Sequence, residues 1–382
     1  MKRKISITTG SRSDYGLLRP ILKKISSSKK LDLYLIAAGM HLTKKYGLTI
    51  NEIKKDGFKI YARVNMVPKD DSAFFLAKSL GEGIIQFSKI FMKLKPDINV
   101  VLGDRDEMLA SALAASHMNI FNAHIHGGEV SGSLDEYNRH AITKISVIHF
   151  AATKKSRERI IKMGENPKNV FLAGSPAVDE VINNKITPKQ ELEKIYGMKF
   201  KGDEIILLQH PVTTRPEESG IEIQNTLNSL IKFKKRIIAI APNSDTGNNQ
   251  IFRYLQSYSN KYDFIKMYRS IPRSDYMGLL KNCGVLVGNS SSGLIEASYF
   301  NIPVVNIGMR QKNRERGKNV FDVEKSSTNL IYQTVKHALK IKRKRKFKNE
   351  YVYGNGTASA KIVKYLESVV LNKELLEKQL LY

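Results

Sequence analysis

The sequence contains a single cysteine, Cys283, in 382 residues. One cysteine can form neither an internal disulfide nor a cysteine-based metal cluster, and this usage is typical of proteins in a reducing compartment. No apolar run approaches the length of a membrane-spanning helix, and the apolar stretch after the basic start is shorter than that of a signal peptide. These absences predict a soluble cytoplasmic protein with no membrane partner.

Two phosphate-binding signatures are also missing. The first half of the chain has no GxGxxG motif, and GxxxxGK[ST] occurs nowhere. Nicotinamide binding and ordinary nucleoside-triphosphate hydrolysis therefore lose support. The chain has no internal repeat and no low-complexity linker. Its hydrophobic content of 42% supports real cores, and its length predicts two domains.

Acidic residues are few relative to basic ones: 36 Asp and Glu stand against 63 Lys and Arg, which gives a formal charge of +27. Such an excess favours anionic partners, namely nucleic acid, an anionic membrane surface or a phosphorylated substrate. Most lysines are scattered, and the one dense basic run, residues 340–348, is typical of a solvated helix end. No recognised nucleic-acid fold surrounds this run. We therefore expect no nucleic-acid partner.

Apolar runs and helical patterns alternate along the chain, which indicates parallel sheets covered by helices. The first half predicts strands at residues 5–9, 33–38, 99–102, 120–125, 147–151 and 170–172. The second half predicts strands at residues 205–208, 237–241, 264–267, 285–287 and 304–307. The fold class is therefore α/β, with two doubly wound Rossmann-like domains that divide near residue 185. We expect a loop over residues 10–16 before a helix beginning near Leu17, and one helix over residues 357–381.

Charged residues follow three predicted strands of the first half. They are Arg12 and Asp14, residues 104–107, and the set His124, His126 and Glu129. Ligands of open α/β sheets bind at the carboxyl ends of strands, so these positions predict a site. His124, His126 and Glu129 are residue types that bind metals, but no further ligand spacing appears. We predict no metal and no cofactor, and His124 also suits a hydrogen-bonded core histidine.

Residues 288–310, GNSSSGLIEASYFNIPVVNIGMR, combine a strand end, a Ser/Gly loop and a helix predicted over residues 294–300. In this geometry the backbone N–H groups and the helix dipole face an anion, although serine is also an ordinary N-cap residue. The three hydroxyl groups suit a phosphate or diphosphate. Glu296 is placed to accept hydrogen bonds from sugar hydroxyls, and Arg310 follows the next strand.

Long blocks of the sequence resemble the UDP-N-acetylglucosamine 2-epimerases, from about residue 4 to the YGNGTASAKI segment. They include TGSRSDYGLLRPIL, VLGDRDEMLASALAAS, HIHGGEVSGSLDEYNRHAITK, HPVTT, GNSSSGLIEA and IGMRQKNRERGKNV. The resemblance is to the hydrolysing branch, which supplies N-acetylmannosamine for sialic acid synthesis and related sugars for legionaminic acid and surface polysaccharides. It implies a glycosyltransferase-B fold with the active site in the interdomain cleft.

The resemblance also implies a reaction. UDP is eliminated across C1–C2 of UDP-N-acetylglucosamine to give a 2-acetamidoglucal, and water is then added to give N-acetylmannosamine. Removal of the weakly acidic C2 proton requires a positioned base, and the departing diphosphate requires amide, hydroxyl and Arg donors. The motifs place Asp104, Arg105, Asp135 and Arg139 around the sugar. They place Arg12 and Asp14 at the cleft, and His210, Ser290, Ser291, Glu296 and Arg310 on UDP.

The sequence departs from many family members at His126, where they have Glu. We rank Asp104 and His126 ahead of Glu129 and Asp135 as the proton-transfer groups, because imidazole suits acid–base work near neutral pH. The resemblance assigns the sugar and proton chemistry to residues 1–185, UDP binding to 186–356, and a helix returning to the first domain to 357–382. It also implies a homo-oligomer, either a dimer or a tetramer.

Three alternatives stay open at this point. The substrate is either UDP-N-acetylglucosamine or UDP-2,4-diacetamido-2,4,6-trideoxy-glucose, because the quoted motifs do not separate them. A UDP-sugar glycosyltransferase on the same fold would use the second half in the same way but needs an acceptor site in the first. A non-catalytic basic module acting through residues 340–348 is the third alternative.

Overall fold

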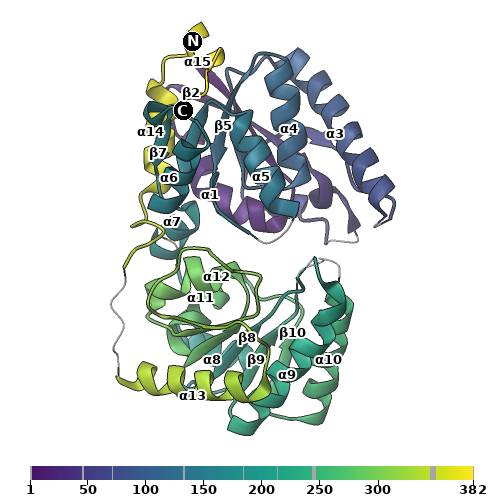
Figure 1. Ribbon diagram of the computed structural model, residues 1–382, viewed down its shortest axis with the longest axis vertical. Coiled ribbons are helices and arrows are strands. Elements are labelled where there is room, and N and C mark those ends of the chain that lie inside the picture. The colour runs from purple at the N-terminus through teal and green to yellow at the C-terminus, as the bar shows by residue number, and fades with distance from the viewer. Residues whose placement is uncertain are drawn as a thin grey trace. The chain divides into compact units, whose positions relative to one another are not determined.

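A computed structural model describes residues 2–44, 47–70, 72–131, 134–183, 185–212, 214–242, 247–344 and 350–381 (Figure 1). The chain divides into two compact units. Unit 1 comprises Met1–Glu129, Leu134–Glu180 and Tyr353–Tyr382, and unit 2 comprises Val130–Ser133 and Val181–Val352. Each unit contains one parallel sheet with hydrophobic clusters on both faces. The predicted fold class, two doubly wound parallel α/β domains, is confirmed.

The sheet of unit 1 has seven described strands in the order β3-β2-β1-β4-β5-β6-β7, and all of its pairings are parallel. The strands are β1 Arg3–Thr9, β2 Leu31–Ala38, β3 Ile60–Val64, β4 Ile98–Leu102, β5 Phe121–Ile125, β6 Ile148–Ala151 and β7 Val170–Leu172. β4 reads INVVL and is buried throughout, as expected for a central strand covered on both faces.

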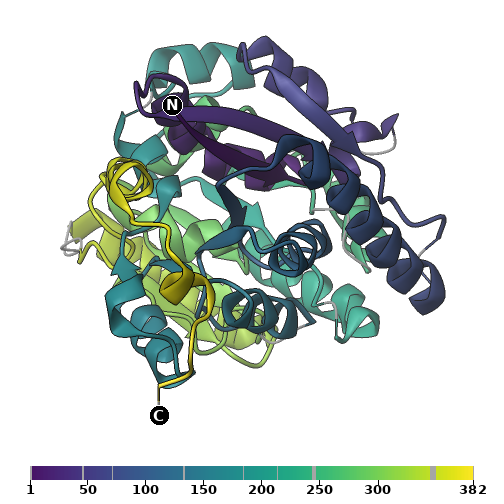
Figure 2. The same ribbon diagram turned by 90° about the horizontal axis from the view of Figure 1, so that it is seen from above.

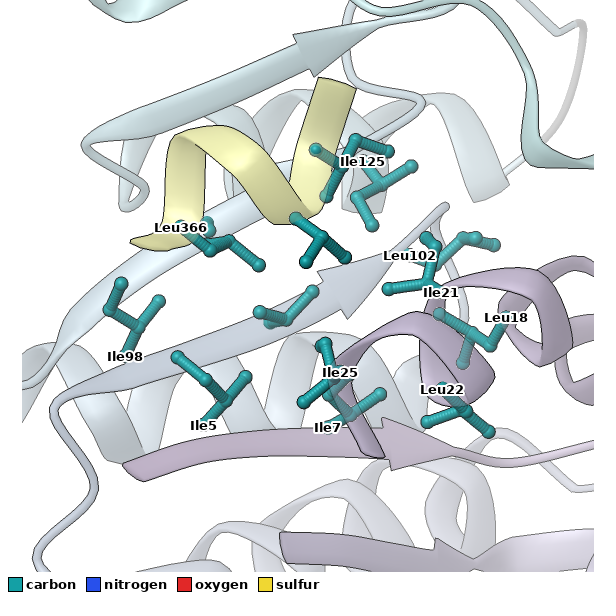
Figure 3. Packing of buried hydrophobic residues seen from close by; sticks show 14 of the residues in the cluster. Ile5, Ile7, Leu18, Ile21, Leu22, Ile25, Ile98, Leu102, Ile125 and Leu366 are labelled. Carbon is teal, nitrogen blue, oxygen red and sulfur yellow. The ribbon is translucent and has the colours of Figure 1, made fainter. Parts of the chain in front are cut away.

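Helices cover both faces of this sheet. They are α1 Arg12–Ser26, α2 Ile50–Lys55, α3 Ala73–Leu94, α4 Asp106–His117, α5 Leu134–Lys144, α6 Lys154–Lys162 and α7 Pro176–Asn183, followed late in the chain by α14 Ala358–Ser368 and α15 Lys373–Leu376. Ile5 and Ile7 of β1 point to the face covered by α1 and α14, where Leu366 joins them (Figure 3). Residues of α3 and α4 pack against the opposite face.

The N-terminal helix begins earlier than predicted. α1 starts at Arg12 rather than near Leu17, because the Ser11 side chain accepts a hydrogen bond from the Asp14 N–H and caps the helix. Asp14 also lies in the first turn, where a carboxylate suits the helix dipole. Arg12 and Asp14 are therefore helical residues and not loop residues, which fixes the direction of both side chains.

The C-terminal segment returns to unit 1, and the prediction of one helix over residues 357–381 is wrong. α14 ends because Val369 is extended, and Asn372 then caps α15 by accepting the Leu375 N–H. The Asp179 carboxylate accepts the backbone N–H groups of Ala358 and Ser359 at 2.9 and 2.7 Å. The chain next to this cap is held as well, since the Ser175 N–H donates to the Tyr353 carbonyl at 2.8 Å.

The sheet of unit 2 has six described strands in the order β10-β9-β8-β11-β12-β13, again all parallel. The strands are β8 Ile205–Leu208, β9 Ile237–Ile240, β10 Ile265–Tyr268, β11 Val285–Gly288, β12 Val304–Ile307 and β13 Val320–Val323. The helices are α8 Lys189–Tyr196, α9 Ser219–Leu230, α10 Asn248–Lys261, α11 Arg273–Asn282, α12 Ser291–Ile295 and α13 Thr328–Lys344. α13 carries the start of the basic run, and residues 345–349 lie outside the described residues.

The strand order positions a candidate site in each unit. In unit 1 the chain order reverses at β1, which lies between β2 and β4, and in unit 2 it reverses at β8, which lies between β9 and β11. Figure 2 shows the same ribbon from above, with the purple N-terminal strands of unit 1 in view. Open α/β sheets bind ligands outside the carboxyl ends of the strands at such a reversal. Among the described residues, no helix is long and apolar enough to cross a membrane.

Candidate active site

Asp104 and Arg139 are brought together at the carboxyl edge of the unit 1 sheet. Asp104 follows β4, and its carboxylate forms an ion pair with the guanidinium of Arg139 from α5. Arg139 is buried, and its Nη1 donates a second hydrogen bond to the carbonyl of Glu129 at 3.1 Å. Arg139 therefore links two other predicted residues, since it contacts the Asp104 side chain and the Glu129 backbone. A guanidinium held at two points keeps the Asp104 carboxylate in a fixed direction.

His126 and Glu129 form a second pair at the same edge. Both side chains are buried, and Nδ1 of His126 lies 3.3 Å from Oε1 of Glu129. His126 has φ +65°, an uncommon backbone conformation for a residue with a side chain, and its N–H donates to the Phe150 carbonyl. Strained backbone of this kind persists where the surroundings fix a side chain for function. An imidazole beside a carboxylate can accept and return a proton.

His124 is part of the core and not of this pair. Its Nε2 lies 2.7 Å from the Gly103 carbonyl and its Nδ1 lies 3.1 Å from the Thr143 hydroxyl. Burial lowers the pKa of His124 to about 3, so the ring is neutral at physiological pH. The two ring nitrogens are thus occupied by core partners, and the core alternative for His124 is confirmed. Nowhere in the described part of the chain do three or more His, Cys, Asp or Glu side chains group as a metal site.

Asp135 is exposed on the first turn of α5, near the start of α4. Between the two helices, the Asn138 side chain donates to the carboxylate of Asp106 at 2.9 Å. Burial raises the pKa of Asp106, and the negative charges of Glu107 and Asp135 act in the same direction. The starts of α4 and α5 therefore gather several carboxylates at one edge, of which Asp135 is accessible to solvent.

Arg12 and Asp14 have different surroundings. Arg12 pairs with Glu52 at 3.3 Å, and both side chains are about half exposed. Asp14 is buried and accepts the Gly10 N–H at 3.3 Å. Burial raises the pKa of Asp14 to about 6, with the Glu107 charge raising it further and the Arg105 charge opposing. Asp14 thus belongs to the carboxylate cluster of unit 1, while Arg12 lies at the surface.

Sequence reasoning included Glu107 among the charged residues after a strand but gave it no role, and it missed His41. Glu107 is 5% exposed, and Arg105 Nε donates to its carboxylate at 3.3 Å. His41 is fully buried, with its ring nitrogens 3.0 Å from the Thr9 hydroxyl and 2.7 Å from the Thr49 hydroxyl, and burial lowers its pKa to about 4. The available signal was positional, since both residues follow strands and lie near glycines.

In unit 2, Asn289 joins the ends of three strands. Its side chain accepts the His210 N–H at 2.7 Å and donates to the His210 carbonyl at 2.9 Å. Its own carbonyl accepts hydrogen bonds from Arg310 Nη1 at 3.2 Å and Gln311 Nε2 at 2.9 Å. Asn289 is fully buried. It therefore positions two predicted residues, His210 and Arg310, although it was not itself predicted as a site residue.

Gly288 permits this junction. It has φ +132°, and a Cβ added to it would lie 2.0 Å from the Leu208 carbonyl oxygen. The ends of β11 and β8 can approach this closely only where one residue lacks a side chain. The close approach brings the Asn289 side chain to the backbone of His210.

Ser290 caps α12, which begins at Ser291, so the helix starts within the predicted Ser/Gly loop, and the helix predicted over residues 294–300 is not continuous. α12 ends at Ile295, and a 3₁₀ turn, η6, covers Ala297–Phe300. Glu296 lies between them, buried, where it forms an ion pair with Arg273 and accepts the Ser292 hydroxyl at 2.5 Å. Its carboxylate is therefore shared with protein partners, because Arg273 reaches it from α11.

The fold and these two polar edges define a class: two-domain parallel α/β proteins of the glycosyltransferase-B type. Comparison with known proteins narrows the class. A family model described as UDP-N-acetylglucosamine 2-epimerase matches residues 23–367. The chain therefore belongs to the UDP-N-acetylglucosamine 2-epimerase family, and it is an enzyme of the UDP-sugar 2-epimerase kind.

Relatives cover almost the whole chain. A UDP-N,N'-diacetylbacillosamine 2-epimerase (hydrolyzing) of Legionella pneumophila is 38% identical, covering 99% of both chains. A UDP-N-acetylglucosamine 2-epimerase of Neisseria meningitidis is 32% identical, covering 98% of this chain and 96% of its own. The crystal structure of the Methanocaldococcus jannaschii UDP-GlcNAc 2-epimerase in complex with UDP-GlcNAc and UDP has a TM-score of 0.79 at 22% identity, covering 95% and 99%. The likeness to the Methanocaldococcus jannaschii structure supports the two-domain α/β fold.

Proposed function

We propose that the protein is a hydrolysing UDP-N-acetylglucosamine 2-epimerase, which converts UDP-N-acetylglucosamine and water to UDP and N-acetylmannosamine. The observation that carries this proposal is the pairing of His126 with Glu129 beside the pair of Asp104 with Arg139. An imidazole and a carboxylate, each held by a partner at one sheet edge, suit proton transfer at a carbon. The family membership supplies the substrate class.

The reaction proceeds in two steps, an elimination and a hydration. A base removes the C2 proton, the C2–H electron pair forms the C1–C2 double bond, and the C1–O bond breaks with its electrons on the diphosphate oxygen. Water then adds its oxygen to C1 and gives up one proton to a base, while an acid delivers a proton to the opposite face of C2. The products are UDP and the free sugar with the inverted C2.

We assign the proton transfers to Asp104 and His126, ahead of Glu129 and Asp135. Glu129 fixes His126 through the 3.3 Å contact, and Arg139 fixes Asp104. Asp135, which is exposed on α5, is assigned to the sugar or the water. Arg105 remains about one-third exposed and is assigned to the sugar.

UDP is assigned to unit 2. The hydroxyl groups of Ser290 and Ser291 and the guanidinium of Arg310 would meet the diphosphate, because charge-assisted donors stabilise the leaving group. His210 would meet the phosphates or the leaving oxygen. Glu296, already held by Arg273 and Ser292, would accept the ribose hydroxyls with its remaining lone pairs. From unit 1 we also assign Arg12 and Asp14 to the nucleotide.

The test is turnover of UDP-N-acetylglucosamine in deuterated water without any acceptor sugar. We expect release of UDP and formation of N-acetylmannosamine that carries deuterium at C2. Retention of the original C2 proton would reject the elimination route. A requirement for an acceptor would instead indicate a glycosyltransferase.

A second substrate is favoured by one specific observation. The Legionella pneumophila relative, which shares 38% identity, is described as acting on UDP-N,N'-diacetylbacillosamine, which is UDP-2,4-diacetamido-2,4,6-trideoxy-glucose. Both UDP-sugars should be assayed side by side at equal concentration. Turnover of this sugar alone would replace the substrate and keep the reaction, whereas turnover of neither would reject the epimerase proposal.

We also propose that the enzyme is a homo-oligomer, either a dimer or a tetramer. The proposal comes from the sequence resemblance. Light scattering on the purified protein measures the molar mass directly. A mass equal to that of one 43.2 kDa chain at micromolar concentration would contradict it.

A further inference from the structure

One buried carboxylate of unit 1 sits in a slot between two glycines. Glu107 lies in the first turn of α4 and is 5% exposed. A Cβ added to Gly10, after β1, would lie 2.6 Å from Cδ of Glu107, and one added to Gly39, after β2, would lie 2.0 Å from its Oε1. Real side chains do not approach this closely. The ends of β1 and β2 therefore leave room for this carboxylate only because both residues are glycine.

Other charged and titratable groups surround the slot. Arg105 Nε donates to Glu107 Oε2 at 3.3 Å. Asp14 from α1 and His41 from η1, a 3₁₀ turn over Gly39–Leu42, are both buried, and each feels the charges of Glu107 and Arg105. Burying a carboxylate is costly, and a well-packed apolar residue of similar volume would serve stability equally well. The charge at Glu107 therefore requires a reason other than packing.

Arg105 supplies that reason. Its side chain is 35% exposed, in contrast to the buried Glu107. A guanidinium is planar, so a hydrogen bond at Nε fixes the plane of the whole group. Glu107 in turn is buried and lies closely packed against the two glycines. The ends of β1 and β2 thus fix the position of Glu107, and Glu107 in turn fixes the orientation of the accessible Arg105 guanidinium.

We propose that Glu107 is a positioning residue for the epimerase reaction, which from its slot between Gly10 and Gly39 holds the Arg105 guanidinium in the direction that meets the sugar. The inference rests on the proposed function. Glu107 does not touch the substrate. It acts through Arg105, which the proposed function already assigns to the sugar.

The first experiment compares Glu107→Gln and Glu107→Asp with the wild type, using steady-state turnover of the UDP-sugar and calorimetric binding of UDP alone. Glu107→Gln keeps the shape but weakens the hold on Arg105, and we expect kcat/KM to fall roughly 100-fold, the scale of a misplaced positioning group. UDP affinity should stay within about twofold, since the groups assigned to the diphosphate and the ribose lie in unit 2 and Glu107 is not itself assigned to UDP. Glu107→Asp keeps the charge and should recover part of the loss.

The control is Glu165→Gln, the same change in another buried carboxylate of unit 1. Glu165 is held by Lys144 at 2.7 Å and by Lys378 at 2.8 Å, and it has no assigned role in the reaction. We expect this variant to lower the melting temperature while kcat/KM stays within about twofold. A merely structural role for Glu107 predicts that both variants behave alike.

The second experiment tests the slot without changing a charge. Gly10 is not in the left-handed backbone region, so Gly10→Ala adds no strain of that kind, and the three atoms nearest to its added Cβ all belong to Glu107. We expect it to lower kcat/KM as Glu107→Gln does, and the double variant to be no worse than the single ones within about twofold. Gly16→Ala is the matched control, because no atom lies within 4 Å of its added Cβ.

The outcomes separate the two proposals. A wild-type protein that turns over no UDP-sugar rejects the proposed function. An active wild type with unchanged kcat/KM in Glu107→Gln overturns the inference alone. If Glu107→Gln does not fold, Gly10→Ala decides in its place, and normal activity of that variant overturns the inference. Losses that multiply in the double variant also overturn it, because they would make the slot and the carboxylate independent.

Discussion

The two sheet edges share a topology and differ in chemistry. In each unit the strand order reverses beside the first strand of the sheet, at β1 and at β8. The edge of unit 1 gathers buried carboxylates and an imidazole, among them Asp14, Glu107, His126 and Glu129. The edge of unit 2 offers the hydroxyls, amides and guanidinium that surround Asn289. One architecture therefore places a site, and the residues after its strands decide what that site can do.

The surroundings of the carboxylates differ most clearly between the edges of unit 1 and unit 2. In unit 1, Asp14 and Glu107 lie near enough that the charge of one raises the pKa of the other. In unit 2, Glu296 is paired with Arg273, which neutralises its charge next to Ser290 and Ser291. An edge that gathers several carboxylates suits proton transfer, whereas an edge with one paired carboxylate and hydroxyl, amide and guanidinium donors suits a diphosphate.

The sharpest test of this division is Asp104→Asn. The variant removes a charge from the proton-transfer edge, and we expect turnover to fall about 1,000-fold, in the range for general acid–base groups. UDP affinity, measured by calorimetry, should be nearly unchanged. A loss of UDP affinity would assign Asp104 to the nucleotide and break the comparison.

The second test concerns pH and stability at the unit 1 edge. The pKa of Asp14 rises from 3.8 to about 6 on folding, chiefly by burial. Protonated Asp14 therefore makes its full contribution to the free energy of unfolding below pH 3.8, and this contribution is lost as pH rises through about 6. We expect the free energy of unfolding of the wild type, relative to Asp14→Asn, to fall by up to about 3 kcal/mol between pH 4 and 7. Urea titrations of both proteins at the two pH values measure this, and parallel curves would refute it.

A third test addresses the unit 2 edge. Arg310→Ala should weaken UDP binding by about 1.5–3 kcal/mol, the range for charge-assisted hydrogen bonds. Lys318→Ala, in the same loop, removes a cation that is 83% exposed and should leave UDP binding unchanged. Equal effects in the two variants would mean that the loop acts only through its net charge.

The smallest effect is expected from the basic run. Lys342 donates to the Asn301 carbonyl, whereas Arg343 is 71% exposed at the end of α13. Replacing Arg343 and Lys344 by alanine should leave sugar turnover almost unchanged, because neither lies at a strand end. A large loss of turnover would favour the basic-module interpretation of this segment.

The sequence predicted the strands that carry continuous apolar runs, such as β4 and β12, because buried parallel strands need no polar alternation. It missed the edge strands β3 and β13, which mix apolar with polar residues. Residues at strand ends were foreseeable as site candidates. The roles of Glu107 and Asn289 were not, since they depend on close approaches at Gly10, Gly39 and Gly288 that only the folded chain creates.

The protein partners of Glu296 could not be predicted for the same reason. From the sequence it was a carboxylate one turn into a helix, open to a sugar. Its partner Arg273 lies 23 residues away along the chain, and no local pattern announces that pair. Long-range partners of single side chains therefore marked the limit of the sequence reasoning, while the fold class and the positions at strand ends were within its reach.

The larger segment of unit 2, Val181–Val352, is an insertion within unit 1, and the cap at Asp179 joins the two sides of this insertion. The inserted segment Val181–Val352 leaves and rejoins unit 1 at places that contact each other, since Ser175 bonds to Tyr353 and Asp179 caps α14. A fragment cut at the apparent domain border near residue 185 would thus lose the helix that fills one face of its sheet. An independently folding unit 1 needs the chain up to Glu180 spliced directly to Tyr353–Tyr382.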